Sequence, residues 1–197
     1  MPREHPLSWH RLVPVAVVLG LALVALLAVK GPDWYQRLYH PLGYETVIAR
    51  ESHAAGIDPY VIAAVINVES GYRPDVASKA GAVGLMQVKP STAHAYAAET
   101  GLPPVVTADM LRDPETNIMV GTRYLAFLVS HYGGDIDKAL AAYNAGMTNV
   151  DKWVAAARKA GTPFRDAIGF PATRHYVQEV GTQSRTYRTL YPETFPK

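Results

Sequence analysis

Apolar residues recur every three to four positions along most of the chain after residue 43, the spacing that places them on one face of an α-helix. Ile118, Leu125 and Leu128 follow this spacing within the longest such segment, residues 114–132. No sustained alternation of apolar and polar residues is found, as a half-buried strand would require. The pattern therefore predicts an all-α domain of about seven helices joined by short connections.

The predicted helices begin and end at residues with the right local chemistry. Asp58-Pro59 and Asp113-Pro114 each combine an N-cap side chain with a proline at the first helical position. Gly56 and Gly133-Gly134 are placed to end helices, and residues 71–84 are too rich in glycine and proline for regular structure. The expected helices cover residues 44–54, 59–69, 91–99, 114–132, 135–143, 148–159 and 173–187.

A separate apolar run precedes this domain. Leu12 to Val29 reads LVPVAVVLGLALVALLAV, 18 residues without a charge, which reaches the length of a membrane-spanning helix. We predict an uncleaved transmembrane signal anchor at 12–30, with a cleaved signal peptide as the alternative. The expected organisation is a cytoplasmic N-terminus at 1–11, the anchor, a juxtamembrane connector at 31–43, a catalytic domain at 44–190 and a tail at 191–197. Basic residues lie on both sides of the apolar run, so the positive-inside rule barely indicates which end of the helix is cytoplasmic.

Composition narrows the class of partner. Apolar residues make up 49% and charged residues 18% of the chain, cysteine is absent, and the net charge is +2. These values are typical of a folded domain without disulfides and give no reason to expect nucleic acid as a partner. Residues 44–151 carry a net −5 and residues 152–197 a net +5. We expect the two segments to neutralise each other, and the alternative is a basic C-terminal surface that meets an anionic polymer.

One acidic residue stands out from the apolar pattern. Glu69 follows Ile62 and Val65 at helical spacing, so it lies on the apolar stripe of its helix rather than opposite it. A carboxyl group held against apolar side chains favours its protonated form, and its pKa should rise toward the range of a general acid. The ordinary alternative is a glutamate at a helix end that reaches solvent.

Several sequence blocks around Glu69 resemble a known family. VINVESGYRPDVASKAGAVGLMQVKPSTA and DPETNIMVGTRYLAFLVSHYGGDIDKALAAYNAG are similar to the soluble-lytic-transglycosylase (SLT) domain, a relative of goose-type lysozyme. The resemblance covers roughly residues 44–187, with its blocks in the family's order. It implies a lysozyme-like, goose-type or SLT helical fold behind the N-terminal transmembrane helix, and it implies peptidoglycan glycan strands as the substrate.

The resemblance also implies a reaction. Glu69 would be the sole catalytic carboxylate for cleaving the β-1,4 bond between N-acetylmuramic acid and N-acetylglucosamine. It would protonate the glycosidic oxygen and then accept the proton of the muramyl 6-hydroxyl, which leaves a 1,6-anhydro end without hydrolysis. Ordinary glycosidases use two carboxylates. The nearest acid in sequence is Asp75, six residues away in a loop.

The same resemblance implies a sugar-binding groove. Its predicted residues are Ser78, Met86, Gln87, Tyr143, Asn144 and Tyr176. For Met86 the alternative is ordinary core packing, for Ser78 a turn, and for Asn144 a helix cap. The ring of Tyr143 would face a sugar, with its hydroxyl near the charge of the transition state. No cofactor and no metal ion is expected.

The last block departs from the family pattern I-P-F-x-E-T-R-x-Y-V. The chain reads IGFPATRHYV, so Ala172 stands where the family has a glutamate, which puts a hydrogen bond near the site in doubt. The leading hypothesis is a membrane-anchored lytic transglycosylase whose domain faces the cell wall. The alternatives are a muramidase of the same fold, with Asp75 activating water, and a non-catalytic peptidoglycan-binding scaffold.

Overall fold

A computed structural model of the chain describes residues 9–195, without the side chains of residues 10, 11 and 28–30. Part of the predicted N-terminal segment 1–11 and of the tail 191–197 lies outside these residues. The chain divides into two compact units between Pro41 and Leu42. The first unit contains α1 (Trp9–Lys30) and α2 (Asp33–Tyr39), a helix within the segment predicted as a connector.

The predicted membrane-spanning helix is the first point of disagreement. Among the described residues, no helix combines the length and the apolar character needed to cross a membrane. The structure therefore does not support the transmembrane anchor predicted at 12–30, because a span needs about 20 consecutive apolar residues. The apolar side chains of α1 are well exposed within this unit, as for Leu19 at 64% and Leu21 at 66%.

The second unit is helical, and no strand occurs among its described residues, which confirms the predicted all-α class. The helix predicted at 91–99 is interrupted at Tyr96, and a short 3₁₀ helix and a short α10 were not predicted. The elements are α3 (Glu45–Ala55), α4 (Pro59–Ser70), α5 (Pro90–Ala95), α6 (Ala97–Thr100), η1 (Met110–Arg112), α7 (Pro114–His131), α8 (Ile136–Ala145), α9 (Met147–Ala160), α10 (Phe164–Ala167) and α11 (Pro171–Leu190).

The predicted helix starts are confirmed by their caps. The Asp58 side chain accepts a hydrogen bond from the backbone N–H of Tyr60 at 3.0 Å, and the Asp113 side chain accepts one from Thr116 at 2.8 Å. These bonds satisfy backbone donors that a helix leaves unpaired at its first turn. At its other end α4 stops at Gly71, whose left-handed conformation (φ 59°) suits glycine.

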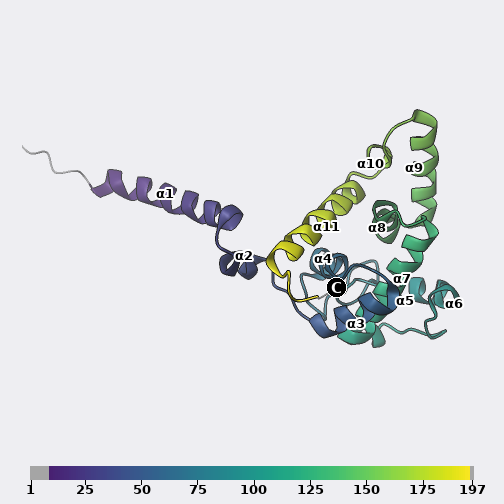
Figure 1. The fold of residues 1–197 in the computed structure, drawn as a ribbon. Helices are drawn as coiled ribbons and strands as arrows, with labels where there is room; N and C mark the ends of the chain where they lie inside the picture. The colour runs from purple at the N-terminus through teal and green to yellow at the C-terminus, as the bar shows by residue number, and fades with distance from the viewer. Residues whose placement is uncertain (1–8, 196–197) are drawn as a thin grey trace, which may run out of the picture. The chain divides into compact units, whose positions relative to one another are not determined.

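The core of the second unit forms around α4. This helix packs against α11, while α7 packs against α3 and α8 (Figure 1). Ile62, Val65 and Ile66 of α4 are completely buried, which holds the helix firmly along most of its length. Glu69 lies one turn beyond them, so its position is fixed by the core while its side chain reaches the edge.

Candidate active site

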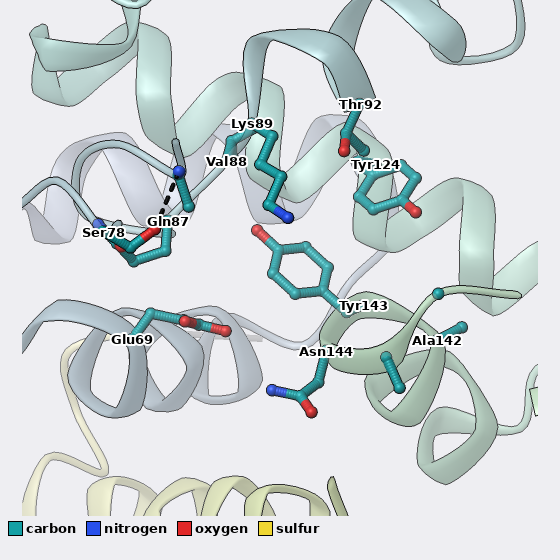
Figure 2. A pocket seen from close by; sticks show the side chains of 13 residues that line it. Glu69, Ser78, Gln87, Val88, Lys89, Thr92, Tyr124, Ala142, Tyr143 and Asn144 are labelled. Carbon is teal, nitrogen blue, oxygen red and sulfur yellow. Dashed lines mark hydrogen bonds between the residues drawn. The ribbon is translucent and has the colours of Figure 1, made fainter. Parts of the chain in front are cut away.

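A groove with a volume of about 380 Å³ opens at the C-terminal end of α4. Its walls come from α4, from the loop between α4 and α5, and from α5, α7 and the end of α8, as Figure 2 shows. Its described lining residues are Glu69, Ser78, Ala82, Gln87, Val88, Lys89, Thr92, Tyr124, Ala142, Tyr143, Asn144, Ala145 and Gly146.

Glu69 is half-buried at the floor of this groove, with its carboxyl group directed into it (Figure 2). Burial raises the pKa of Glu69 from 4.5 to about 7, and the neighbouring Tyr176 hydroxyl lowers it by a smaller amount. The predicted effect of the apolar stripe is therefore present. A carboxyl with this pKa can donate a proton near neutral pH and accept one once it is ionised.

Tyr176 lies behind the carboxyl rather than along the groove. The residue is 6% exposed on α11 and does not line the groove, in contrast to the prediction that it would. Its hydroxyl forms no hydrogen bond of good geometry with the described residues, but it lies near enough to Glu69 to lower the pKa of that carboxyl. Burial and the nearby charge of Glu69 raise the pKa of Tyr176, so this hydroxyl stays protonated and available to the carboxyl.

The side chain of Tyr143 forms a hydrogen bond with the backbone of Met86. The Tyr143 hydroxyl lines the groove but donates a hydrogen bond to the Met86 carbonyl oxygen at 2.8 Å. Its proton is thus already used, whereas the sequence prediction placed this hydroxyl near the transition-state charge. The Met86 side chain is completely buried and packs against Gly121 and Thr122 of α7. The predicted sugar-facing role of Met86 is corrected to core packing.

Asn117, a completely buried residue of α7, fixes the loop that carries the groove residues. Its side-chain oxygen accepts from the Met86 backbone N–H at 2.7 Å, and its amide group donates to the carbonyl oxygens of Val83 and Leu111, each at 2.8 Å. Gly84 passes directly over this amide with φ 80°, where a Cβ atom would collide with it. Two of these bonds therefore hold the loop in one conformation, and the third connects Asn117 to η1.

Gln87 lines the groove from the end of this loop. It adopts a left-handed backbone conformation (φ 48°), and its amide group donates to the carbonyl oxygens of Val76 and Gly84, each at 2.9 Å. Its side-chain oxygen has no hydrogen-bond partner among the described residues. Ser78 also lines the groove, but its hydroxyl accepts from the Ala82 N–H at 3.0 Å and so stabilises the turn 78–82.

Asn144 lines the groove from the end of α8, across from the loop that carries Gln87 and Ser78. Its side-chain oxygen accepts a hydrogen bond from the Thr173 hydroxyl at 2.8 Å, which ties the groove to the first turn of α11. The helix α11 begins at Pro171, two residues before its predicted start, and Phe170 occupies its N-cap position without a side-chain bond. Ala172 is exposed and does not line the groove.

Sequence reasoning missed several groove residues, and those with polar side chains are Lys89, Thr92 and Tyr124. Tyr124 belongs to the apolar stripe of α7, so its helical spacing predicts core packing and hides its contact with the groove. Lys89 and Thr92 flank the start of α5, where nothing in the periodicity points to a site. The loop that ends at Lys89 is held by Asn117, a contact distant in sequence.

The charged groups of the groove are few. Among the lining residues that the structure describes, Glu69 is the single carboxylate and Lys89 the single cation. Asp75 is exposed and does not line the groove. The arrangement offers one acid of near-neutral pKa surrounded by amide and hydroxyl groups. That set is suited to proton transfer on a neutral polar substrate such as a glycan.

Comparison with known proteins finds relatives of the domain that carries this groove. The family model "Transglycosylase SLT domain" matches residues 46–163. The soluble lytic murein transglycosylase of Escherichia coli K12 is 35% identical over 150 residues, which cover 75% of this chain and 23% of that protein. An endo-type membrane-bound lytic murein transglycosylase A from Cronobacter sakazakii is 36% identical over half of each chain.

Solved structures give the same result. The crystal structure of the 70 kDa soluble lytic transglycosylase SLT70 from Escherichia coli superposes with a TM-score of 0.74 at 31% identity, covering 86% of this chain and 28% of that one. An inactive mutant of the lytic transglycosylase Slt from Pseudomonas aeruginosa gives 0.70 at 29%, covering 82% and 26%. The chain thus spans about a quarter of the length of these relatives. Its matched residues and its fold establish that the chain belongs to the transglycosylase SLT domain family.

Proposed function

We propose that this protein is a peptidoglycan lytic transglycosylase that cleaves the β-1,4 bond between N-acetylmuramic acid and N-acetylglucosamine. The observation that carries the proposal is Glu69, a half-buried carboxyl with a pKa of about 7 in a polar groove whose described lining has no second carboxylate. Hydrolysing glycosidases need a second carboxylate about 5–9.5 Å from the first. A groove with one acid favours a reaction in which the substrate supplies its own nucleophile.

The proposed reaction uses the two protonation states of Glu69 in turn. The protonated carboxyl gives its proton to the glycosidic oxygen, and the bond from that oxygen to the muramyl anomeric carbon breaks. The resulting carboxylate accepts the proton of the muramyl 6-hydroxyl as its oxygen bonds to the anomeric carbon. Glu69 ends protonated, no water is consumed, and one product carries a 1,6-anhydro ring. A pKa near 7 serves both steps because neither form is strongly favoured at neutral pH.

The remaining groove residues would hold the strand. The free side-chain oxygen of Gln87 and the amide group of Asn144 are suited to the acetamido and hydroxyl groups of the sugars. The Tyr143 ring presents an aromatic surface whose orientation is fixed by its bond to the Met86 carbonyl. Ser78 contributes a hydroxyl at the rim. These roles extend the predictions made from the family resemblance.

The relatives are consistent with this assignment. Proteins similar in sequence are named as lytic murein transglycosylases, and a solved relative was crystallised as an inactive glutamate-to-glutamine mutant. A further structure of the 70 kDa enzyme is a complex with bulgecin A. For this chain, both the activity and the peptidoglycan substrate are part of the proposal, because the chain corresponds to only part of those proteins.

The decisive experiment is mass spectrometry of the muropeptides that the purified full chain releases from peptidoglycan. Products ending in 1,6-anhydromuramic acid are expected. Reducing-end products, heavier by one water, would make the protein a muramidase and direct attention to Asp75, which Asp75→Asn would test. Glu69→Gln should abolish release while binding persists. The matched control is Glu115→Gln, which changes an exposed glutamate outside the groove. This variant should cleave normally. A folded chain that releases nothing would favour the scaffold hypothesis.

We also propose that α1 attaches the protein to a membrane, with the groove on the cell-wall side. The exposed apolar side chains of α1 would be stabilised by lipid, and one set of relatives is named as membrane-bound. Cell fractionation tests this: the full chain should sediment with membranes, and a chain lacking residues 1–41 should not. Recovery of the full chain in the supernatant would contradict attachment. Its intact mass also distinguishes an uncleaved segment from a cleaved signal peptide.

A further inference from the structure

The groove contains a cation for which the proposed mechanism has no use. We infer that Lys89 is a specificity-determining residue whose ammonium group binds a carboxylate carried by the muramyl arm of the substrate. This inference rests on the proposed function and adds a substrate contact to it. Lys89 is exposed, lines the groove and extends from the loop wall opposite Glu69 toward the Tyr143 ring (Figure 2).

The backbone on both sides of Lys89 is firmly held. Val88, the preceding residue, exchanges backbone hydrogen bonds with Val83 at 3.0 and 3.1 Å, within the loop that Asn117 fixes. Pro90, the next residue, begins α5 and has a fixed φ angle. The stem of Lys89 therefore leaves the wall at a defined point, and only its own side-chain torsions remain free.

The ammonium group of Lys89 is available for a ligand. It has no ion pair or hydrogen bond with any residue that the structure describes. Lys138, by contrast, forms an ion pair with Asp135 at 2.7 Å, and Arg165 forms one with Asp137 at 2.5 Å. The carboxylate of the groove is also not its partner: burial and Tyr176 account for the pKa of Glu69, without a contribution from Lys89. Lys89 thus acts on binding and leaves the acid unchanged.

The chemistry of the proposed substrate supplies one kind of anion. The sugar rings, hydroxyls and acetamido groups of the strand are neutral. Negative charge comes from carboxylates on the lactyl arm of muramic acid: the lactyl carboxylate itself on strands without stems, or the carboxylates of an attached stem peptide. A hydrogen bond between an ammonium group and a carboxylate is stronger than one between neutral groups, so Lys89 favours a substrate that carries such an anion. The shared chemistry is a carboxylate on the arm at the muramyl ring.

The test compares Lys89→Met with wild type and with two further variants. Lys89→Arg keeps the charge and should restore most of the lost binding. Lys79→Met removes another exposed lysine without a partner from the same loop, outside the groove, and is the matched control. We expect Lys89→Met to raise KM about tenfold, in line with the loss of one charge-assisted contact. Its kcat and the pH at which activity falls should match wild type.

Three substrates identify the carboxylate. Stem-bearing strands and amidase-treated strands with free lactyl carboxylates separate the two sources, because the larger effect of Lys89→Met falls on the strand whose carboxylate Lys89 binds. On strands with all carboxylates converted to amides, wild type and Lys89→Met should have equal KM. Equal KM on every substrate would overturn the inference and leave Lys89 as a solvated surface residue. A change in kcat or pH profile would also overturn it, since Lys89 would then act on Glu69.

A binding measurement tests the Lys89 contact independently of the proposed cleavage activity. In the Glu69→Gln background no cleavage is expected, and the Kd for each strand is measured directly by calorimetry. Loss of affinity in the double variant Glu69→Gln, Lys89→Met supports the contact even if wild type proves to be a hydrolase. Failure of wild type to bind any strand would instead overturn the proposed function itself.

Discussion

The raised pKa of Glu69 predicts that the acid destabilises the domain at neutral and alkaline pH. The group binds its proton more tightly in the folded state (pKa about 7) than in the unfolded state (4.5). Below pH 4.5 it is protonated in both states and has no effect. As pH rises from 4.5 to 7 the unfolded state loses its proton first, so stability falls. Above about pH 7 the full cost is present, roughly 3 kcal/mol at 1.36 kcal/mol per pKa unit.

Glu69→Gln removes the titrating group, so it tests the predicted free-energy cost without any activity assay. Urea unfolding of residues 42–197, followed by circular dichroism from pH 4 to pH 9, gives the free energy of unfolding of both proteins. The other carboxylates titrate in both and cancel in the difference. The variant should gain about 3 kcal/mol relative to wild type between pH 4 and pH 8.5. The control Glu115→Gln should show a difference within about 0.5 kcal/mol throughout.

A flat difference for Glu69→Gln would refute the reasoning. It would mean that water or structural relaxation solvates the carboxylate in the folded domain, so that burial does not raise its pKa. If the stability gain of Glu69→Gln develops with a midpoint well below pH 7, the pKa of Glu69 in the folded domain is correspondingly lower. Either result would also remove the physical basis for using Glu69 as an acid near neutral pH.

Three further predictions concern the surroundings of Glu69. Tyr176→Phe removes a hydroxyl that lowers the pKa of Glu69, so the pH at which cleavage declines should move upward in a pH–rate profile, and an unchanged profile would contradict the contact. Asn117→Ala leaves the Met86 N–H and the Leu111 carbonyl unpaired and removes one of the two bonds to the Val83 carbonyl, so it should cost about 3–5 kcal/mol in urea unfolding, whereas a cost below about 1 kcal/mol would show that water replaces the amide. Gly84→Ala and Gly81→Ala share a φ of 80°, but only a Cβ at Gly84 meets Asn117, so Gly84→Ala should be the more destabilising by at least about 2 kcal/mol in thermal unfolding. Equal losses for the two glycine variants would mean that the loop moves aside.

The sequence predicted those parts of the fold that local chemistry decides. Asp58 and Asp113 cap their helices because the cap and its partner are two or three residues apart, a distance that sequence spacing specifies directly. The position of Glu69 on an apolar stripe was predictable for the same reason. The break at Tyr96 between α5 and α6 was not, because no glycine or proline marks it.

The parts of the site that sequence reasoning missed depend on contacts between distant segments. Met86 is in the core because Gly121 leaves room for its side chain 35 positions later in the chain, and the sequence alone gives no sign of that pairing. The Tyr143 hydroxyl is bonded to the Met86 carbonyl across 57 residues. Family resemblance identified these residues as belonging to the site region, but it did not determine which atoms face the groove.

The position of Tyr176 has a consequence for how the acid can be adjusted. The family model ends at residue 163, and α11 begins at Pro171. The hydroxyl that modulates the pKa of Glu69 therefore comes from a helix outside the matched residues, although the carboxyl itself lies within them. In two chains that are identical over residues 46–163, Glu69 could ionise at different pH values if their last helices differ. The helix α11 is thus a natural place for engineering the working pH of the domain while its sugar-facing surface stays the same.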